Sequence, residues 1–253
     1  MDLGLNGKRC VVLGGSRGIG RAIAEGLAAE GASLAICGRD AASLEAASGA
    51  LKARGVVVHA DACDLARPVD LGRFLDGACA ALGGVDVLVH NASALAIGSD
   101  LAAWEASLRV DLMAAVHACD RVIPWMAGSN GGSILLVSSI SGLEASPWSD
   151  FAYTTVKAAL IAYAKKLSVA HAASRVRVNS IAPGCVEFPG GFWANAKQND
   201  PVLYGQMLGS IPAARLGTPE EIADVAVFLC SPRAGWVTGE CVAVDGGQHR
   251  AMR

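Results

Sequence analysis

The ten residues VVLGGSRGIG, numbered 11–20, join an apolar run to an alanine-rich stretch through a glycine-rich turn. Gly14, Gly18 and Gly20 carry no Cβ, so the backbone of this turn can approach a ligand closely. The N–H groups at the start of the following helix would then face an anion. Glycine patterns are common in a chain with 30 glycines, but this one stands between the first predicted strand and the first predicted helix. The turn therefore predicts a phosphate-binding site, with an ordinary tight turn as the alternative.

Short β-branched runs alternate with alanine-rich stretches along the rest of the chain. Strands are predicted at residues 9–13, 33–37, 56–60, 85–90, 133–138, 175–181 and 240–244. Helices are predicted at residues 20–30, 41–53, 71–82, 101–126, 151–173 and 219–230. Strands that are apolar on both faces and separated by helices are typical of a parallel sheet covered on both sides. We therefore predict an α/β Rossmann fold, a doubly wound parallel sheet of about seven strands in three layers, as one domain over residues 1–253.

The segment at residues 187–217 breaks the alternation. It carries Phe188, Phe192, Trp193 and Tyr204 among glycines and prolines, and it is too long for an ordinary connection. Long insertions of this kind are often functional. We predict a substrate lid with an apolar inner surface, and the alternative is that its aromatic residues fill a subunit interface.

Composition excludes several classes of protein. With 53% hydrophobic and 17% charged residues the chain is not disordered, and a net charge of -2 gives no general attraction to nucleic acid or anionic membranes. Eight cysteines are scattered singly, without zinc-binding spacing, and small buried core residues are their simplest interpretation. No signal-like segment and no apolar run of about 18 residues occurs. We expect a reduced, soluble, cytoplasmic protein without a metal site.

Five motifs follow one another along the chain: Gly14-x-x-x-Gly18-x-Gly20, Asn91-Ala92, Ser139, Tyr153-x-x-x-Lys157 and Pro183-Gly184. In this order and spacing they resemble the short-chain dehydrogenase/reductase family in its single-domain branch, and they are similar to 3-oxoacyl-[acyl-carrier-protein] reductases. The resemblance covers the whole chain. It implies a nicotinamide cofactor and hydride transfer between that cofactor and a carbonyl or alcohol.

The resemblance also implies which residues contact the cofactor. Asp64 and Leu65 would meet the adenine, Asn91 and Ala92 the ribose, and the turn at residues 183–186 would close over the nicotinamide. The complete set is Gly14, Ser16, Arg17, Gly18, Ile19, Gly20, Arg39, Asp64, Leu65, Asn91, Ala92, Tyr153, Lys157, Pro183, Gly184 and Val186. Phe188 stands where the family often has a threonine that bonds to the diphosphate.

The choice between NAD and NADP depends on the end of the second predicted strand. NAD-binding proteins carry an acidic residue there, whereas this chain reads Cys37-Gly38-Arg39. Asp40 follows, and we interpret it as the N-cap of the next helix. Arg17 and Arg39 could both reach a 2′-phosphate, each adding a charged hydrogen bond of about 1.5–3 kcal/mol. We predict NADP(H); the alternative is that both arginines are solvated surface charges.

The candidate catalytic residues are Tyr153, Lys157, Ser139 and Asp111. Tyr153 and Lys157 are four residues apart on a predicted helix, so they share one face. By resemblance, Tyr153 is the proton donor, Lys157 adjusts the acidity of Tyr153 and binds the ribose, and Ser139 holds the substrate oxygen. Ser138 is the alternative for that serine.

Asp111 stands where the family commonly has an asparagine whose main-chain carbonyl anchors a water beside the lysine. A carboxylate there would raise the pKa of Lys157, and the alternative is a buried residue bonded to the backbone. We interpret His90, just before Asn91, as a packed strand residue.

Together these observations predict an NADP(H)-dependent oxidoreductase acting on an apolar ketone or a 3-oxoacyl thioester, assembled as a homotetramer. The alternatives are an NAD-dependent alcohol or sugar dehydrogenase of the same fold, and a nucleotide-sensing protein without turnover. Arg109, Arg121, Lys197 and Arg215 are possible contacts for an acyl carrier protein, but they are widely dispersed in the sequence.

Overall fold

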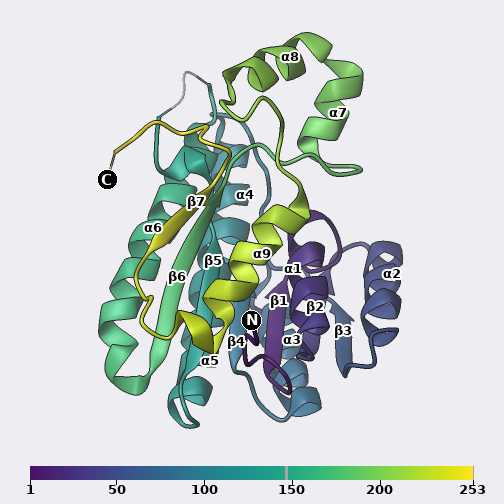
Figure 1. Cartoon of the computed structure of the whole chain (residues 1–253), viewed down its shortest axis with the longest axis vertical. Helices are drawn as coiled ribbons and strands as arrows, with labels where there is room; N and C mark the ends of the chain where they lie inside the picture. Colours follow the sequence, from purple (N-terminus) through teal and green to yellow (C-terminus); the bar gives the residue numbers. More distant parts are fainter. Residues whose placement is uncertain (146–147, 253) are drawn as a thin grey trace.

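The computed structural model describes residues 1–145 and 148–252 and contains one sheet of parallel strands (Figure 1). The strand order is β3-β2-β1-β4-β5-β6-β7. The strands are β1 (Arg9–Leu13), β2 (Ser33–Gly38), β3 (Val58–Ala62), β4 (Val87–His90), β5 (Gly132–Val137), β6 (Val176–Pro183) and β7 (Cys241–Val244). The order reverses direction at β1, as in a doubly wound sheet, so the predicted Rossmann fold is confirmed.

Helices cover both faces of the sheet (Figure 1). The α-helices are α1 (Gly18–Ala29), α2 (Ala41–Lys52), α3 (Pro68–Leu82), α4 (Leu101–Ser107), α5 (Ala114–Ala127), α6 (Phe151–His171), α7 (Phe192–Asn199), α8 (Pro201–Ser210) and α9 (Pro219–Cys230). Shorter segments are the π-helix η1 (Leu108–Met113) and the 3-10 turns η2 (Ile140–Gly142), η3 (Ala172–Ser174) and η4 (Pro232–Ala234). Among these segments, α1, α2 and α9 pack on one face, and α3, α5 and α6 on the other.

Strand β1 explains why the strands read as continuous apolar runs. Cys10 and Val12 are buried against the α1 side, while Val11 and Leu13 are buried against the α3 side. Successive side chains of a strand point to opposite faces, so a central strand needs apolar residues at every position. This double burial stabilises the strand that delivers the glycine turn.

Three predicted elements differ from the structure. Strand β3 lies two residues beyond the predicted 56–60, because pairing with β2 aligns Leu34 with Val58 and the preceding valines stay outside the ladder. Helix α3 begins at Pro68 rather than at residue 71, since a proline at the first helical position lacks an N–H that would be unpaired anyway. The predicted helix 101–126 is interrupted by the π-helix η1, which has a wider turn than an α-helix. Amino-acid composition gives no signal for such a turn.

Two predicted helix caps are present. The Asp40 carboxylate accepts a hydrogen bond from the Ser43 amide at 2.8 Å, and Thr218 forms a capping box with Glu221 at the start of α9. The Ser43 hydroxyl and amide, and more weakly Arg17, lower the pKa of Asp40. Asp40 therefore serves the start of α2, as the sequence indicates.

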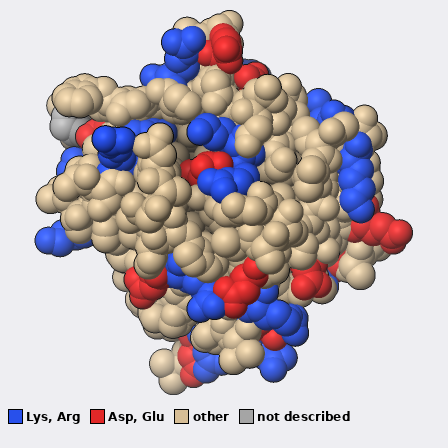
Figure 2. Space-filling model, turned by 90° about the horizontal axis from the view of Figure 1, so that it is seen from below, with Lys and Arg blue, Asp and Glu red and all other residues tan. Residues whose placement is uncertain are grey.

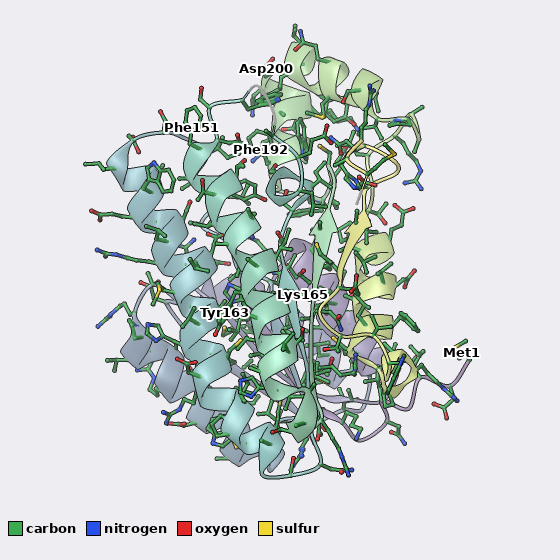
Figure 3. All side chains as sticks on the ribbon, turned by 90° about the vertical axis from the view of Figure 1, so that its left-hand side faces the viewer. Met1, Phe151, Tyr163, Lys165, Phe192 and Asp200 are labelled. Carbon is green, nitrogen blue, oxygen red and sulfur yellow. The ribbon has the colours of Figure 1, made fainter. Side chains whose placement is uncertain are left out.

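The segment at residues 187–217 folds into α7 and α8, which lie together beyond one end of the sheet (Figure 1). Figure 3 shows that α6 runs from Phe151, at the end of the molecule that carries Phe192 of α7, past Tyr163 and Lys165. The site described below lies at this end. None of the helices in the described residues combines the length and the apolar character needed to span a membrane.

Candidate functional site

A cleft of about 1250 Å³ runs along the carboxyl ends of the strands. It is lined by residues that follow β1, β2, β3, β4, β5 and β6, together with parts of α6, α7 and α8. Fifteen of the predicted site residues line it: Gly14, Ser16, Arg17, Ile19, Arg39, Asp64, Leu65, Asn91, Ala92, Ser139, Tyr153, Lys157, Pro183, Gly184 and Val186. Parallel strands present all their carboxyl ends at one edge, which is why distant segments meet here.

Gly18, Gly20 and Asp111 are predicted site residues that do not line this cleft. A Cβ on Gly20 would lie 2.2 Å from the Gly14 carbonyl oxygen, so this glycine lets α1 pack against the turn. Gly18 has a φ of +55° and lies under the Phe188 ring, where a Cβ would approach that ring to 2.6 Å. These two glycines shape the turn from behind its lining surface.

The turn itself suits a phosphate group. Gly14 has a φ of +78°, which favours glycine, and its carbonyl oxygen accepts a hydrogen bond from the Asn91 side-chain amide at 3.0 Å. The turn leads into the N-terminus of α1, a helix of 12 residues whose first N–H groups lack partners within the helix. A glycine cradle at a helix start fits the diphosphate of a dinucleotide.

Arg17 and Arg39, which follow β1 and β2, are exposed and both line the cleft. We call this part of the cleft the adenosine end, because the family resemblance implies that the adenosine of the cofactor binds there. Gly38 is the last residue of β2 and precedes Arg39, and a Cβ there would come within 2.5 Å of the Ser16 hydroxyl. An acidic side chain at position 38 would require Ser16 to move. Both guanidinium groups are hydrogen-bond donors that can contact an anionic group in the cleft.

Tyr153 and Lys157 lie one turn apart on α6, with the Lys157 ammonium 5.5 Å from the centre of the Tyr153 ring. Lys157 is only 2% exposed, and its Nζ donates a hydrogen bond to the Val137 carbonyl at 3.1 Å. Burial alone would lower the pKa of Lys157, but Asp111 and Tyr153 raise it on balance. The ammonium therefore stays charged beside the phenol.

Asp111 lies behind the cleft and is fully buried. One carboxylate oxygen forms an ion pair with Lys157 Nζ at 3.1 Å, and the other accepts a hydrogen bond from the Ala94 amide at 2.9 Å. The predicted carboxylate beside the lysine and its effect on the lysine pKa are thus both present in the structure. Asp111 connects η1 to α6 and to the loop after β4.

The Asp111 main-chain carbonyl contacts His90 Nε2 at 2.9 Å. The expected water-anchoring carbonyl therefore already has a side-chain partner in this chain. Burial, and secondarily the Lys157 charge, lower the pKa of His90 to about 4. His90 is neutral at physiological pH, in keeping with the interpretation of a packed strand residue.

The structure distinguishes the two serines. The Ser138 hydroxyl donates a hydrogen bond to the Lys157 carbonyl at 2.7 Å, so its proton is committed to α6. The Ser139 oxygen accepts a hydrogen bond from the Ser141 amide at 3.1 Å, which leaves its own proton available for a ligand in the cleft. Gly142 permits this arrangement, because a Cβ there would lie 2.7 Å from the Lys157 backbone.

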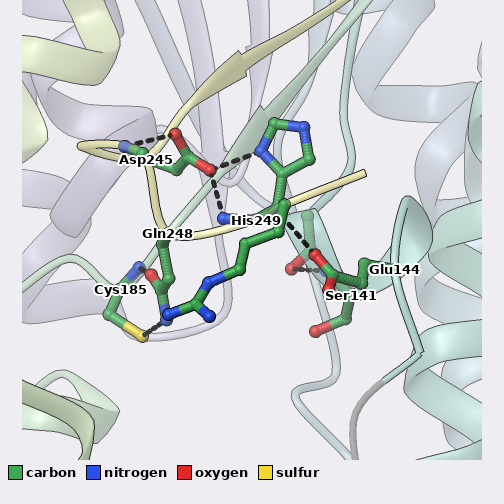
Figure 4. Close-up of polar contacts among 9 residues, drawn as sticks. Ser141, Glu144, Cys185, Asp245, Gln248 and His249 are labelled. Carbon is green, nitrogen blue, oxygen red and sulfur yellow. Dashed lines mark hydrogen bonds and ion pairs between the residues drawn. The ribbon is translucent and has the colours of Figure 1, made fainter. Parts of the chain in front are cut away.

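The C-terminal segment also reaches the cleft, which the sequence analysis missed (Figure 4). Asp245 accepts hydrogen bonds from the His249 amide and contacts its ring nitrogen at 2.6 Å, while the Gln248 side chain bonds to the Cys185 amide and thiol. The Arg250 amide donates to Glu144 at 2.6 Å. Because the last predicted strand is parallel, residues just after residue 244 must emerge at the same edge, and this signal could have identified them.

Comparisons with known proteins agree with this geometry. A family model described as "Enoyl-(Acyl carrier protein) reductase" matches residues 14–249. Dehydrogenase/reductase SDR family member 4 from Oryctolagus cuniculus is 33% identical, covering 96% of this chain and 94% of its own length. L-sorbose reductase from Gluconobacter frateurii, solved with NADPH and L-sorbose, is 33% identical with a TM-score of 0.90 and 100% of both chains covered.

A second solved structure, a 7α-hydroxysteroid dehydrogenase with NADH and 7-oxo glycochenodeoxycholic acid, is 29% identical with a TM-score of 0.91. It is aligned over 100% of this chain and 98% of its own. These similarities extend over the whole sheet and over the cleft that contains Ser139, Tyr153 and Lys157. The chain belongs to the short-chain dehydrogenase/reductase family of nicotinamide-dependent oxidoreductases.

Proposed function

We propose that this protein is an NADP(H)-dependent oxidoreductase that interconverts an apolar ketone, or a 3-oxoacyl thioester, and the corresponding alcohol. The observation that carries the proposal is the meeting of Ser139, Tyr153 and Lys157 in one cleft with the glycine turn and two arginines. The bound nicotinamide would supply the hydride. Side chains of the protein itself would carry out the other steps.

In the direction of reduction, Tyr153 donates its phenolic proton to the carbonyl oxygen of the substrate. Ser139 donates a hydrogen bond to the same oxygen and holds it for protonation. The buried Lys157 ammonium stabilises the phenolate that forms, since opposite charges in a low-dielectric site attract strongly. Asp111 holds Lys157 in position through the ion pair at 3.1 Å.

NADP is favoured over NAD by the adenosine end. Arg17 and Arg39 both line the cleft with cationic side chains, and the carboxylate of Asp40 already caps α2. The L-sorbose reductase structure contains NADPH, whereas the 7α-hydroxysteroid dehydrogenase structure contains NADH, so the family relationship alone leaves the choice open. An NAD-dependent alcohol or sugar dehydrogenase is the alternative within the same family.

Arg39→Ala should raise the Kd for NADPH roughly ten- to a hundredfold, the effect of losing one charged hydrogen bond. The Kd for NADH should stay nearly constant, because NADH has no 2′-phosphate. Fluorescence titration of both cofactors measures this, with Arg54→Ala, at an exposed position outside the cleft lining, as the matched control. Equal Kd values for NADPH and NADH in the unaltered protein would contradict the proposal.

The walls of the cleft support an apolar substrate. Leu95, Ile97, Trp148 and Phe192 all line it and stay 39–49% exposed, so one cleft gathers several large apolar side chains that an apolar ligand could cover. The four basic residues considered for an acyl carrier protein are each paired with a carboxylate: Arg109 with Glu105, Arg121 with Asp76, Lys197 with Glu187 and Arg215 with Glu221. The apolar walls and the pairing of these four basic residues favour a small apolar ketone. Figure 2 shows the opposite end of the molecule, away from α7 and α8, where basic and acidic side chains are interspersed.

We propose that α7 and α8, within residues 187–217, form a lid of the single domain and cover the substrate. Phe192, Trp193 and Met207 from this segment line the cleft. The Tyr204 hydroxyl and Lys197 both contact the Glu187 carboxylate, at 2.5 and 2.8 Å, and so join the two helices to the start of the segment.

A screen for NADPH oxidation over apolar ketones tests the activity. No turnover on any ketone, with NADPH bound tightly, would favour the nucleotide-sensing alternative.

We propose a homotetramer built on apolar surfaces outside the cleft. Phe151 and Val169 of α6, Phe228 of α9 and Trp236 are 39–100% exposed. Light scattering at micromolar concentration should give about four times the 25.7 kDa of one chain. Val169→Glu should reduce this mass, because a charge would be buried at the contact. A monomer mass for the unaltered protein would refute the assembly.

A further inference from the structure

Two cysteines lie at the adenosine end of the cleft and have no role in the proposed reaction. Cys37 occupies the last part of β2, and Cys63 follows directly after β3. We propose that these two thiols form an oxidisable pair, converted by a peroxide to a disulfide that weakens nucleotide binding. The last part of this proposal rests on the proposed function, because it assumes that the cleft binds NADP(H).

The sheet places both side chains on the same face. Cys37 is aligned with Asp61 in the parallel ladder between β2 and β3, and Cys63 lies two residues beyond Asp61. Residues i and i+2 of a strand point to the same side, and aligned neighbours do so too. Pairing continues past the strand, since the Cys63 amide donates to the Gly38 carbonyl at 3.2 Å. Both cysteines belong to one buried apolar cluster.

The two thiols differ in access and in acidity. Cys63 lines the cleft and is 4% exposed, whereas Cys37 is completely buried. A hydrogen bond between the thiols lowers the pKa of Cys63, and together with burial it raises the pKa of Cys37. A thiolate is the reactive form of cysteine. Cys63 is therefore the thiol that reacts first, and Cys37 is the resolving thiol.

The oxidation balances with hydrogen peroxide as the oxidant. The Cys63 sulfur attacks one peroxide oxygen, the O–O bond breaks, and a sulfenic acid forms while the departing hydroxide takes the thiol proton as water. The Cys37 sulfur then attacks the sulfenic sulfur, the S–O bond breaks, and the second oxygen leaves as water with the Cys37 proton. Two thiols lose two electrons in total, and one peroxide becomes two waters.

The disulfide would change the nucleotide site through the backbone. The offset of two residues puts the Cα atoms about 8 Å apart by ordinary strand geometry, and a disulfide needs less than about 7 Å. The excess lies along the strands, because Cys63 is already hydrogen-bonded to Gly38 across them, so closing the bond must shift the backbone at Cys63 along the strand direction and disturb that hydrogen bond. Asp64 follows Cys63, and Arg39 lies two residues after Cys37, so both cleft-lining residues would move.

The test uses the full-length protein without nucleotide, treated with hydrogen peroxide and then alkylated with iodoacetamide. Peptide mass spectrometry should find the Cys37 and Cys63 peptides joined, with the loss of two hydrogen atoms, and dithiothreitol should restore both thiols. Saturating NADPH should slow the reaction by covering Cys63. Oxidised protein should bind NADPH about tenfold more weakly or worse, comparable to the loss of one charged hydrogen bond.

Variants sharpen this experiment. Cys37→Ala keeps a small apolar residue in the buried cluster and should stop oxidation at the sulfenic or sulfinic acid of Cys63, while Cys79→Ser, a half-exposed thiol elsewhere on α3, should leave the disulfide unchanged. Peroxide treatment that yields no Cys37–Cys63 disulfide, or a disulfide without change in NADPH affinity, would overturn the proposal. Weak NADPH binding by the reduced protein would instead count against the proposed function.

Discussion

Tyr153→Phe is expected to lower the rate of ketone reduction by at least about a hundredfold, since general acid catalysis contributes two to four orders of magnitude. The ring and the helix persist, so the Kd for NADPH should change little. Loss of NADPH absorbance gives the rate, and cofactor fluorescence gives the affinity. Lys157→Ala should impair both quantities, because Lys157 would contact the cofactor and also stabilise the phenolate.

The same helix provides the matched control for this substitution. Tyr163 lies ten residues further along α6, is half-buried, and has its hydroxyl paired with the Cys119 thiol outside the cleft. Tyr163→Phe should leave the rate of reduction nearly unchanged. If Tyr153→Phe keeps more than about a tenth of the unaltered rate, another group donates the proton and the proposed mechanism is wrong.

Asp111→Ala is expected to lower the free energy of unfolding by about 3–5 kcal/mol, because it leaves the buried Lys157 ammonium without its carboxylate. Asp111→Asn should cost less, since its one amide oxygen can still accept a hydrogen bond from Lys157, although the amide nitrogen then faces the Ala94 N–H. Both variants lack the charge, so the difference between them reports the hydrogen bond and the volume that the amide retains. Urea unfolding at neutral pH provides the measurement.

The pH for this experiment follows from the direction of the Lys157 shift. Its folded pKa lies above the ordinary 10.5, so the stability contributed by the pair is complete below about pH 10.5 and is lost as pH rises through the folded value. Neutral pH therefore reports the full effect. Glu105→Ala is the control, because Glu105 pairs with Arg109 at 3.5 Å on the exposed surface and such pairs contribute at most about 1 kcal/mol. A loss below about 1 kcal/mol for Asp111→Ala would show that the buried pair does not stabilise the fold.

Much of this fold could be predicted from the sequence because burial and turn chemistry act locally. The β1 residues are apolar at every position, and Asp40 and Thr218 mark helix starts through side-chain oxygens. The glycine turn could be identified for the same reason. Phosphate binding needs a backbone conformation that few residues other than glycine adopt.

Other features depend on neighbours that lie far away in the sequence. The register of β3 is determined by its pairing with β2, so Val56 and Val57 gave a misleading signal. The π-helix η1 brings Asp111 within reach of Lys157, which is 46 residues away along the chain. No local sequence pattern predicts this π-helix. The pairing of Cys37 with Cys63 likewise required the aligned strands.

Hydrogen bonds between the end of β5 and α6 are donated in both directions. Lys157 donates to the carbonyl of Val137, and Ser138 donates back to the carbonyl of Lys157, with Gly142 packed against the same helical turn. Two reciprocal hydrogen bonds and a close backbone contact resist sliding as well as separation. The segment that carries Ser139 and the helix that carries Tyr153 should therefore fluctuate as one stiff body. The proposed opening and closing of α7 and α8 would then admit a substrate without changing the alignment of the two hydroxyl groups.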